Sequence, residues 1–70
     1  MKHGARNDIL ATVTAIKRGG VMAQVEVELV GTSYRMSSVM TIDSVEELNL
    51  KEGDTVHVLA KAVNVLLVKP

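Results

Sequence analysis

The chain has 70 residues, no net charge at pH 7, no Cys, Phe or Trp, and a single Tyr. The lack of Cys excludes disulfides and thiolate metal sites, and the zero net charge disfavours a protein that binds the phosphate backbone of nucleic acid. Because 47% of the residues are hydrophobic, and because so short a chain buries only about 60% of its unfolded surface, we expect an obligate homo-oligomer.

The first half of the chain predicts three strands. Residues 9–18 are rich in β-branched side chains, and a Gly-Gly pair follows them as a turn signal. Residues 21–29 alternate strictly between apolar and polar side chains, which predicts a strand with one buried and one solvent-facing side. After a Gly-Thr-Ser turn, residues 34–41 predict a third strand with a less regular pattern.

The second half predicts a helical turn and two more strands. Ser44 and Glu47 have the spacing of a capping box, in which each side chain accepts from the other residue's N–H. Residues 55–61 predict a fourth strand. Residues 65–68 predict a fifth that is apolar on both faces, so we expect another subunit to cover its second face. The expected fold is all-β: a small five-stranded Greek-key barrel of the oligonucleotide/oligosaccharide-binding (OB) kind, formed by residues 1–70 as one domain.

Two fixed positive charges stand near the chain ends in similar surroundings. Arg6 and Lys61 each lie beside small residues that leave backbone N–H groups open, a combination that suits a small oxyanion. An ordinary surface role for Arg6, and a role for Lys61 in protecting an edge strand from aggregation, remain alternatives. The sequence shows no nucleophile–base pair and no local metal-binding spacing, so we expect neither an enzyme nor a site for a free metal cation.

Three motifs occur in order along the chain and together resemble one family. The start M-K-H-G-A-R-N is similar to M-K-x-S-A-R-N, the central T-I-D-S-V-E-E-L-N-L-K-E-G-D to T-x-x-S-V-E-E-L-x-L-x-x-G-D, and K-A-V-N-V near the end to K-A-[ST]-x-V. These are the motifs of molbindins, the single-domain form of the molybdate-binding Mop/TOBE family, and the resemblance covers essentially the whole chain.

The resemblance implies a cytoplasmic binder of molybdate and tungstate that is not an enzyme. We expect no membrane and no nucleic-acid partner, because no apolar run is long enough to span a membrane and the net charge is zero. It also implies a homo-hexamer, arranged as a trimer of dimers, that holds the anions between subunits. Carried over to this sequence, the first class of site takes six residues from one subunit: Gly4, Ala5, Arg6, Lys61, Ala62 and Val63. A neighbouring subunit contributes Thr41, and Ser37 and Ser38 are the candidates for a second class of site on the three-fold axis.

Two departures from the family pattern bear on the expected site. Gly4 stands where the family has Ser, and Val63 where it has Ser or Thr, so two hydroxyl donors are missing. His3 is a candidate replacement donor, and backbone N–H groups are another. Because the sequence departs from the family's molybdate-binding pattern, we expect a slight preference for binding tungstate over molybdate.

Two other functions remain open for a chain of this kind. A nucleic-acid-binding OB barrel would use stacked aromatic side chains and a basic groove, which one Tyr and zero net charge disfavour. A regulatory or oligomerisation module would sense the ligand without storing it, and the number of anions bound per subunit separates it from a storage protein.

Overall fold

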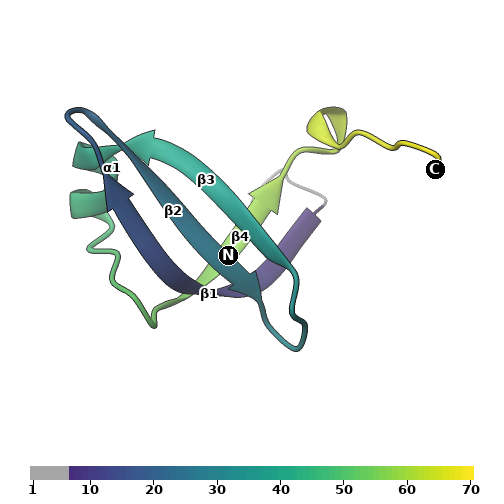
Figure 1. Ribbon diagram of the computed structural model, residues 1–70, viewed down its shortest axis with the longest axis horizontal. Helices are drawn as coiled ribbons and strands as arrows, with labels where there is room; N and C mark the ends of the chain where they lie inside the picture. Colours follow the sequence, from purple (N-terminus) through teal and green to yellow (C-terminus); the bar gives the residue numbers. More distant parts are fainter. Residues whose placement is uncertain (1–6) are drawn as a thin grey trace.

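Four antiparallel strands and one short helix make up residues 7–70, the part of the chain that the computed structural model describes. The strands form one sheet in the order β3-β2-β1-β4 (Figure 1). The elements in chain order are β1 (Asn7–Arg18), β2 (Met22–Leu29), β3 (Arg35–Thr41), α1 (Ile42–Glu47), β4 (Thr55–Ala60) and the 3-10 turn η1 (Ala62–Asn64). The mostly-β architecture with little helix agrees with the prediction, and the first four predicted strands are present.

β1 curls the sheet because it is long, pairs on both edges and carries a β-bulge. Residues 7–12 pair with β4, and residues 11–18 pair with β2. The register between β1 and β2 shifts between Val13 and Ala15, which leaves Thr14 as the extra residue, and a bulge of this kind bends its strand. The sheet therefore curves into a half-barrel with one concave and one convex side (Figure 1).

The concave side holds the core, which consists of small aliphatic side chains. Val45 of α1 lies across one end of the half-barrel and is almost completely buried. The buried side chains are Ala11, Val13, Ala23, Val25, Val27 and Val45. On β2, the buried residues Ala23, Val25 and Val27 are apolar positions of the alternating sequence. The period-two pattern therefore correctly predicted which face of β2 is buried.

The turn before β4 ties that strand to the middle of β1. The Gly53 N–H donates to the Val13 carbonyl at 2.8 Å, and the Val13 N–H donates to the Asp54 carbonyl at 2.9 Å. Gly53 has a φ of 93°, in the region that glycine adopts without steric cost. A glycine at this position therefore lets the chain turn and start β4 beside β1.

The prediction that Ser44 caps the helix is wrong. Thr41 is the N-cap: it is still extended as the last residue of β3, with φ −70° and ψ 153°, and its Oγ1 accepts from the Ser44 N–H at 3.1 Å. The helix therefore starts directly at the end of the strand, three residues earlier than the capping-box pattern placed it. Thr and Ser are both good N-cap residues, and Thr41 is the one used because β3 ends there and α1 follows directly.

The fifth strand, predicted over residues 65–68, is not formed within the single chain. Residues 62–64 form η1, and residues 65–70 have no strand pairing and project beyond the sheet (Figure 1). A strand needs a partner for its N–H and C=O groups, and the chain runs past the end of β4 instead of turning back along it. One chain is thus a four-stranded half-barrel and not the expected five-stranded Greek-key barrel. No helix in the described residues is long and apolar enough to cross a membrane.

Candidate functional site

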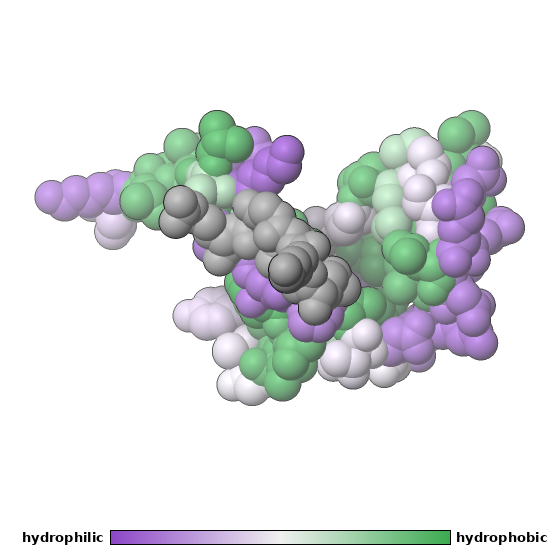
Figure 2. Space-filling model, turned by 180° about the vertical axis from the view of Figure 1, so that it is seen from behind, coloured by the Kyte–Doolittle hydropathy of each residue, from purple (hydrophilic) through white to green (hydrophobic). Residues whose placement is uncertain are grey.

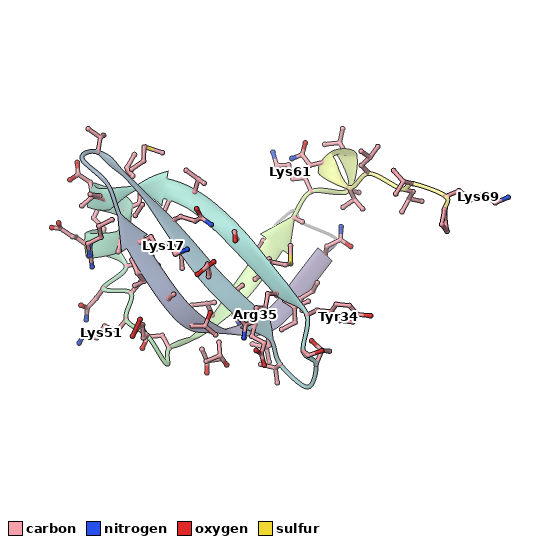
Figure 3. The ribbon with its side chains drawn as sticks, viewed as in Figure 1. Lys17, Tyr34, Arg35, Lys51, Lys61 and Lys69 are labelled. Atoms are coloured by element: carbon pink, nitrogen blue, oxygen red, sulfur yellow. The ribbon has the colours of Figure 1, made fainter. Side chains whose placement is uncertain are left out.

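Lys61 and its neighbours lie where β4 ends. Lys61 is the N-cap of η1, and the turn is closed by hydrogen bonds from Asn64 N to the Lys61 carbonyl at 2.9 Å and from Val65 N to the Ala62 carbonyl at 3.2 Å. The N–H groups of Ala62 and Val63 come first in the turn and have no acceptor within it. The Val63 side chain is 86% exposed. The Lys61 side chain (Figure 3) and these two backbone donors thus follow one another directly after the end of β4.

Lys61 is one of the described cations that make no ion pair. Lys17 lies 3.7 Å from a Glu26 carboxylate oxygen, and Arg35 lies 3.6 Å from a Glu28 carboxylate oxygen, both as exposed cross-strand pairs. Within residues 7–70, Lys61 makes no such ion pair. Its charge is therefore not offset by a described carboxylate and is available to an anionic ligand.

The start of β1 lies beside the end of β4. Asn7 pairs with Ala60, and the Asn7 Nδ2 donates to the Ala60 carbonyl at 3.0 Å across 53 residues of sequence. This contact was not predicted, although Asn7 belongs to the N-terminal motif that carries the family resemblance. The predicted ligands Gly4, Ala5 and Arg6, and the candidate donor His3, lie outside the described residues.

Thr41 lies at the other end of the sheet. It pairs with Met22 at the start of β2, and the next residue, Ala23, pairs with Arg18 at the end of β1. Lys61 instead follows Ala60, which pairs with Asn7 at the beginning of β1. The two positions therefore lie at opposite ends of the curved strand β1. Within one copy of the chain, Thr41 and Lys61 are thus at different ends of the sheet.

The Thr41 hydroxyl already has two neighbours in the single chain. Besides accepting from the Ser44 N–H, its Oγ1 lies 2.8 Å from the Ser44 Oγ. The motif containing both residues contributed to the family resemblance, but Ser44 was assigned only a capping role. The structure places two hydroxyl groups, and not one, at this end of the sheet.

Ser37 and Ser38 are neighbours in the middle of β3 and lie on opposite sides of the sheet. Ser38 pairs with the buried Val25, and Ser37 pairs with Glu26 and lies 3.4 Å from the Gln24 Nε2. Both residues border an open groove of about 370 Å³, Ser38 on the face that carries Val25 and Ser37 at the exposed edge of the sheet. Apart from them and His57, the groove is apolar, so the described residues offer few donors to an anion there.

His57 of β4 contacts Asp8 of β1 through an ionisable pair of side chains. Its Nδ1 lies 2.7 Å from Asp8 Oδ1, and the His57 side chain is half-exposed. Among residues 7–70, no group of three or more His, Asp or Glu side chains is positioned to hold a metal ion.

Comparisons with known proteins identify relatives along nearly the whole chain. The family model for the TOBE domain matches residues 4–67. Molybdenum-pterin-binding protein 2 of Clostridium pasteurianum is 36% identical over 67 residues, which are 96% of this chain and 97% of that protein. A molybdate-binding protein from Sporomusa ovata has a structure with 40% identity and a TM-score of 0.89, covering 99% of this chain and 100% of that one.

A longer relative shares the same fold. The structure of ModG, described as a cytoplasmic molybdate-binding protein and solved with molybdate bound, is 39% identical and has a TM-score of 0.82. The match covers 89% of this chain but 43% of ModG. The four-stranded half-barrel described above is therefore the fold of proteins whose names refer to molybdate or molybdenum-pterin.

Proposed function

The chain belongs to the TOBE domain family, and from that premise we propose that it binds molybdate or tungstate and serves to store or buffer these anions. The likeness to the Sporomusa ovata molybdate-binding protein, end to end and at 40% identity, carries this proposal. The relatives are named for binding and not for catalysis, which supports a binding protein over an enzyme. The single domain spans residues 1–70, and the description of ModG supports a cytoplasmic location.

The proposed site lies between copies of the chain. One copy contributes the ammonium of Lys61 and the backbone N–H groups of Ala62 and Val63, together with Gly4, Ala5 and Arg6 from its N-terminal segment. A second copy contributes the hydroxyl of Thr41. The separation of Thr41 from Lys61 along β1 supports this division, because both residues reach one anion only if they come from different chains. The proposed assembly is a homo-hexamer, a trimer of dimers.

The chemistry of the donors suits a tetrahedral dianion. Molybdate and tungstate have four oxygens that accept hydrogen bonds, and guanidinium, ammonium and amide groups supply donors with full or partial positive charge. At a subunit boundary the effective dielectric falls, which strengthens the attraction. Because Gly4 and Val63 lack the family's hydroxyls, backbone N–H groups take a larger share, and we propose a modest preference for tungstate. Ser37 and Ser38 are proposed for the second class of site.

Native mass spectrometry with competing molybdate, tungstate and sulfate tests the proposal. We expect six copies and at least as many molybdate or tungstate ions as subunits, with sulfate excluded. A ligand-sensing module that stores nothing would bind far fewer anions than subunits. Absence of both anions from the assembly at saturating concentration would refute the proposal.

Substitution of the two cations locates the site. Loss of one hydrogen bond to a charged group costs about 1.5–3 kcal/mol, so Lys61→Ala is expected to weaken binding by roughly ten- to 150-fold, and Arg6→Ala with Lys61→Ala to abolish it. Lys51→Ala is the matched control, because Lys51 lies at the opposite end of the molecule (Figure 3). Unchanged uptake by the double variant would show that the anion binds elsewhere.

A further inference from the structure

His57, Leu59 and Lys61 lie on one face of the chain at the end of β4. His57 and Leu59 are exposed positions in the alternating burial pattern of the strand. Lys61 after it is still extended, with φ −66° and ψ 138°, so the alternation continues to this residue. Asp8 of β1 pairs with Leu59, and directly paired residues share a face of the sheet. His57 and Lys61 are therefore the two diagonal neighbours of Asp8 on that face.

The Asp8 carboxylate contacts one of these two neighbours and not the other. Its Oδ1 lies 2.7 Å from the His57 Nδ1, whereas Lys61 forms no ion pair within residues 7–70. Diagonal neighbours on antiparallel strands lie about 7–8 Å apart, within reach of long side chains. The Lys61 ammonium is therefore within reach of a carboxylate that, in this structure, is held by His57.

Other charged groups lie near His57 in the described part of the chain. β4 is an edge strand, so β1 is its strand neighbour there, and Asp8 is the charged group of β1 that faces His57. From the turn before β4, Asp54 borders the same depression as His57, and its Oδ2 accepts from the Lys51 N–H at 2.9 Å. The segment after β4 stands apart from the main body (Figure 2), and the His57 and Asp8 side chains are 50% and 34% exposed. Protons and anions in solution therefore reach this end of the ladder.

The charge of the imidazole determines how firmly the carboxylate is held. Histidine is the side chain whose charge ordinarily changes between about pH 5 and 8. A protonated imidazole donates a charge-assisted hydrogen bond to a carboxylate, which is roughly twice as strong as one between neutral groups. When the imidazole is neutral, the carboxylate is held less firmly, and an ammonium within reach competes for it. A carboxylate paired with Lys61 would occupy the ammonium that the proposed function gives to the oxyanion, and it would repel the incoming dianion.

We propose that Asp8 competes with the oxyanion for Lys61, and that protonated His57 holds Asp8 away, so that anion uptake is linked to uptake of a proton. The inference rests on the proposed function of Lys61 and adds the pair that controls it. The anion binds best to the form with protonated His57, and linkage is reciprocal, so the affinity rises as the pH falls. His57 is thus a positioning residue that acts through Asp8.

The separation of the charges sets the expected size of the effect. For a carboxylate about 10 Å from the anion, neutralising its single charge changes the affinity for a dianion about fourfold at the dielectric constant of bulk water. The effect is larger where the site excludes water. We therefore expect the affinity for molybdate to fall at least about fourfold between pH 6 and pH 8.

Calorimetric titration with molybdate, in buffers of different ionisation enthalpy, measures the protons taken up with each anion. We expect the unchanged chain to take up a fraction of a proton per molybdate at pH 7. His57→Gln keeps a neutral donor for Asp8 but does not titrate, so its proton uptake should vanish and its affinity at pH 6 should fall to that of the unchanged chain at pH 8. His3→Gln, which changes the other histidine, should keep the proton uptake. Equal proton uptake by the unchanged chain and His57→Gln would overturn the inference.

A second variant gives a readout that does not depend on how His57→Gln folds. Asp8→Asn removes the competing charge, so its affinity for molybdate at pH 8 should rise about fourfold or more, toward the value at pH 6. Glu52→Gln is the matched control: it removes the same charge in the exposed turn beside Lys51, at the far end of the molecule from Lys61 in Figure 3. Because distant exposed charges are screened, it should change the affinity less than about twofold. If Asp8 had only a structural role, Asp8→Asn would bind molybdate equally or more weakly at pH 8, and that result would contradict the inference.

The two proposals fail in different ways. Binding of molybdate with equal affinity at pH 6 and pH 8 would overturn the proton linkage and leave the proposed function standing. Absence of molybdate and tungstate binding at either pH would refute the proposed function and the linkage with it.

Discussion

Thr41 is the residue at which the fold and the proposed anion site use the same hydroxyl group. Its oxygen accepts from the Ser44 N–H at 3.1 Å and caps α1, and its proton is directed to the Ser44 Oγ at 2.8 Å. A hydroxyl has one proton, so donating to an anion ends the donation from Thr41 to the Ser44 Oγ. The cap is unaffected, because there the oxygen accepts. Substitutions can therefore separate the two roles.

Three substitutions at this position make the separation. Thr41→Ser keeps both the acceptor and the donor. Thr41→Asp keeps an acceptor for the Ser44 N–H, since Asp is at least as good an N-cap as Thr, but it replaces the donor by a carboxylate. Thr41→Ala removes both roles.

The expected magnitudes differ between the variants. Loss of the cap in Thr41→Ala costs about 1 kcal/mol, which lowers the Tm of a domain of this size by roughly 4–8 °C. Loss of the hydrogen bond to the anion weakens binding by a further ~1.5–3 kcal/mol. In Thr41→Asp a carboxylate about 4 Å from a dianion repels it by about 8 kcal/mol at an effective dielectric of 20, so uptake is lost while the anion-free Tm stays near that of the unchanged chain.

Thermal unfolding at one fixed protein concentration, without and with molybdate, measures both effects, and calorimetric titration gives the affinity. Thr41→Asp that still binds molybdate as the unchanged chain does would remove Thr41 from the site. Thr41→Asp that unfolds as early as Thr41→Ala without anion would show that the cap is not what Thr41 contributes to stability. Ser44→Ala frees the Thr41 proton and should not weaken binding; a large loss would make Ser44 the donor instead.

Three further predictions concern the scaffold. Asn7→Ala removes the hydrogen bond to the Ala60 carbonyl. We expect a loss of about 1 kcal/mol in unfolding free energy, measured by denaturant titration, and weaker molybdate binding, measured by ligand titration. Equal affinity for molybdate would mean that this contact does not position the site. Val45→Ala removes buried methyl groups from α1 and should cost about 2 kcal/mol in urea denaturation, with the exposed Val39→Ala as a near-neutral control. Gly53→Ala places a side chain at φ 93° with nothing within 4 Å of its Cβ, so conformational strain alone should cost about 1–2 kcal/mol; an unchanged midpoint would contradict this.

The sequence predicted the elements whose signal is local. The alternation over residues 21–29 reports directly which face of β2 is buried, and the structure places that strand at Met22–Leu29. The helix start was misplaced because Thr41 and Ser44 are both capping residues, and only the end of β3 distinguishes them. Residues 65–68 have the composition of a strand, but strand formation requires a partner that the single chain does not provide.

The arrangement of the candidate site was less predictable, because it depends on the order of strands in the sheet. Lys61 and Thr41 are separated along β1 because β3 runs in the same direction as β1 and β4 runs in the opposite direction, so the two strands finish at opposite ends. Sequence spacing carries no such information. The contact of Asn7 with Ala60 likewise depends on the pairing of the first strand with the last. The motifs predicted a set of site residues without showing which of them meet within one chain.

The pairing of β1 with both β2 and β4 also has a consequence for how the chain folds. β1–β2 and β2–β3 are hairpins with short connections, whereas the β1–β4 ladder joins residues as far apart as Asn7 and Ala60. Long-range pairings close large loops and form late. We therefore expect the three-stranded meander to nucleate first and the β4 ladder to close last. In native-state hydrogen exchange, the end of the molecule carrying Lys61 should then open most readily, and a bound anion should slow exchange most at that end.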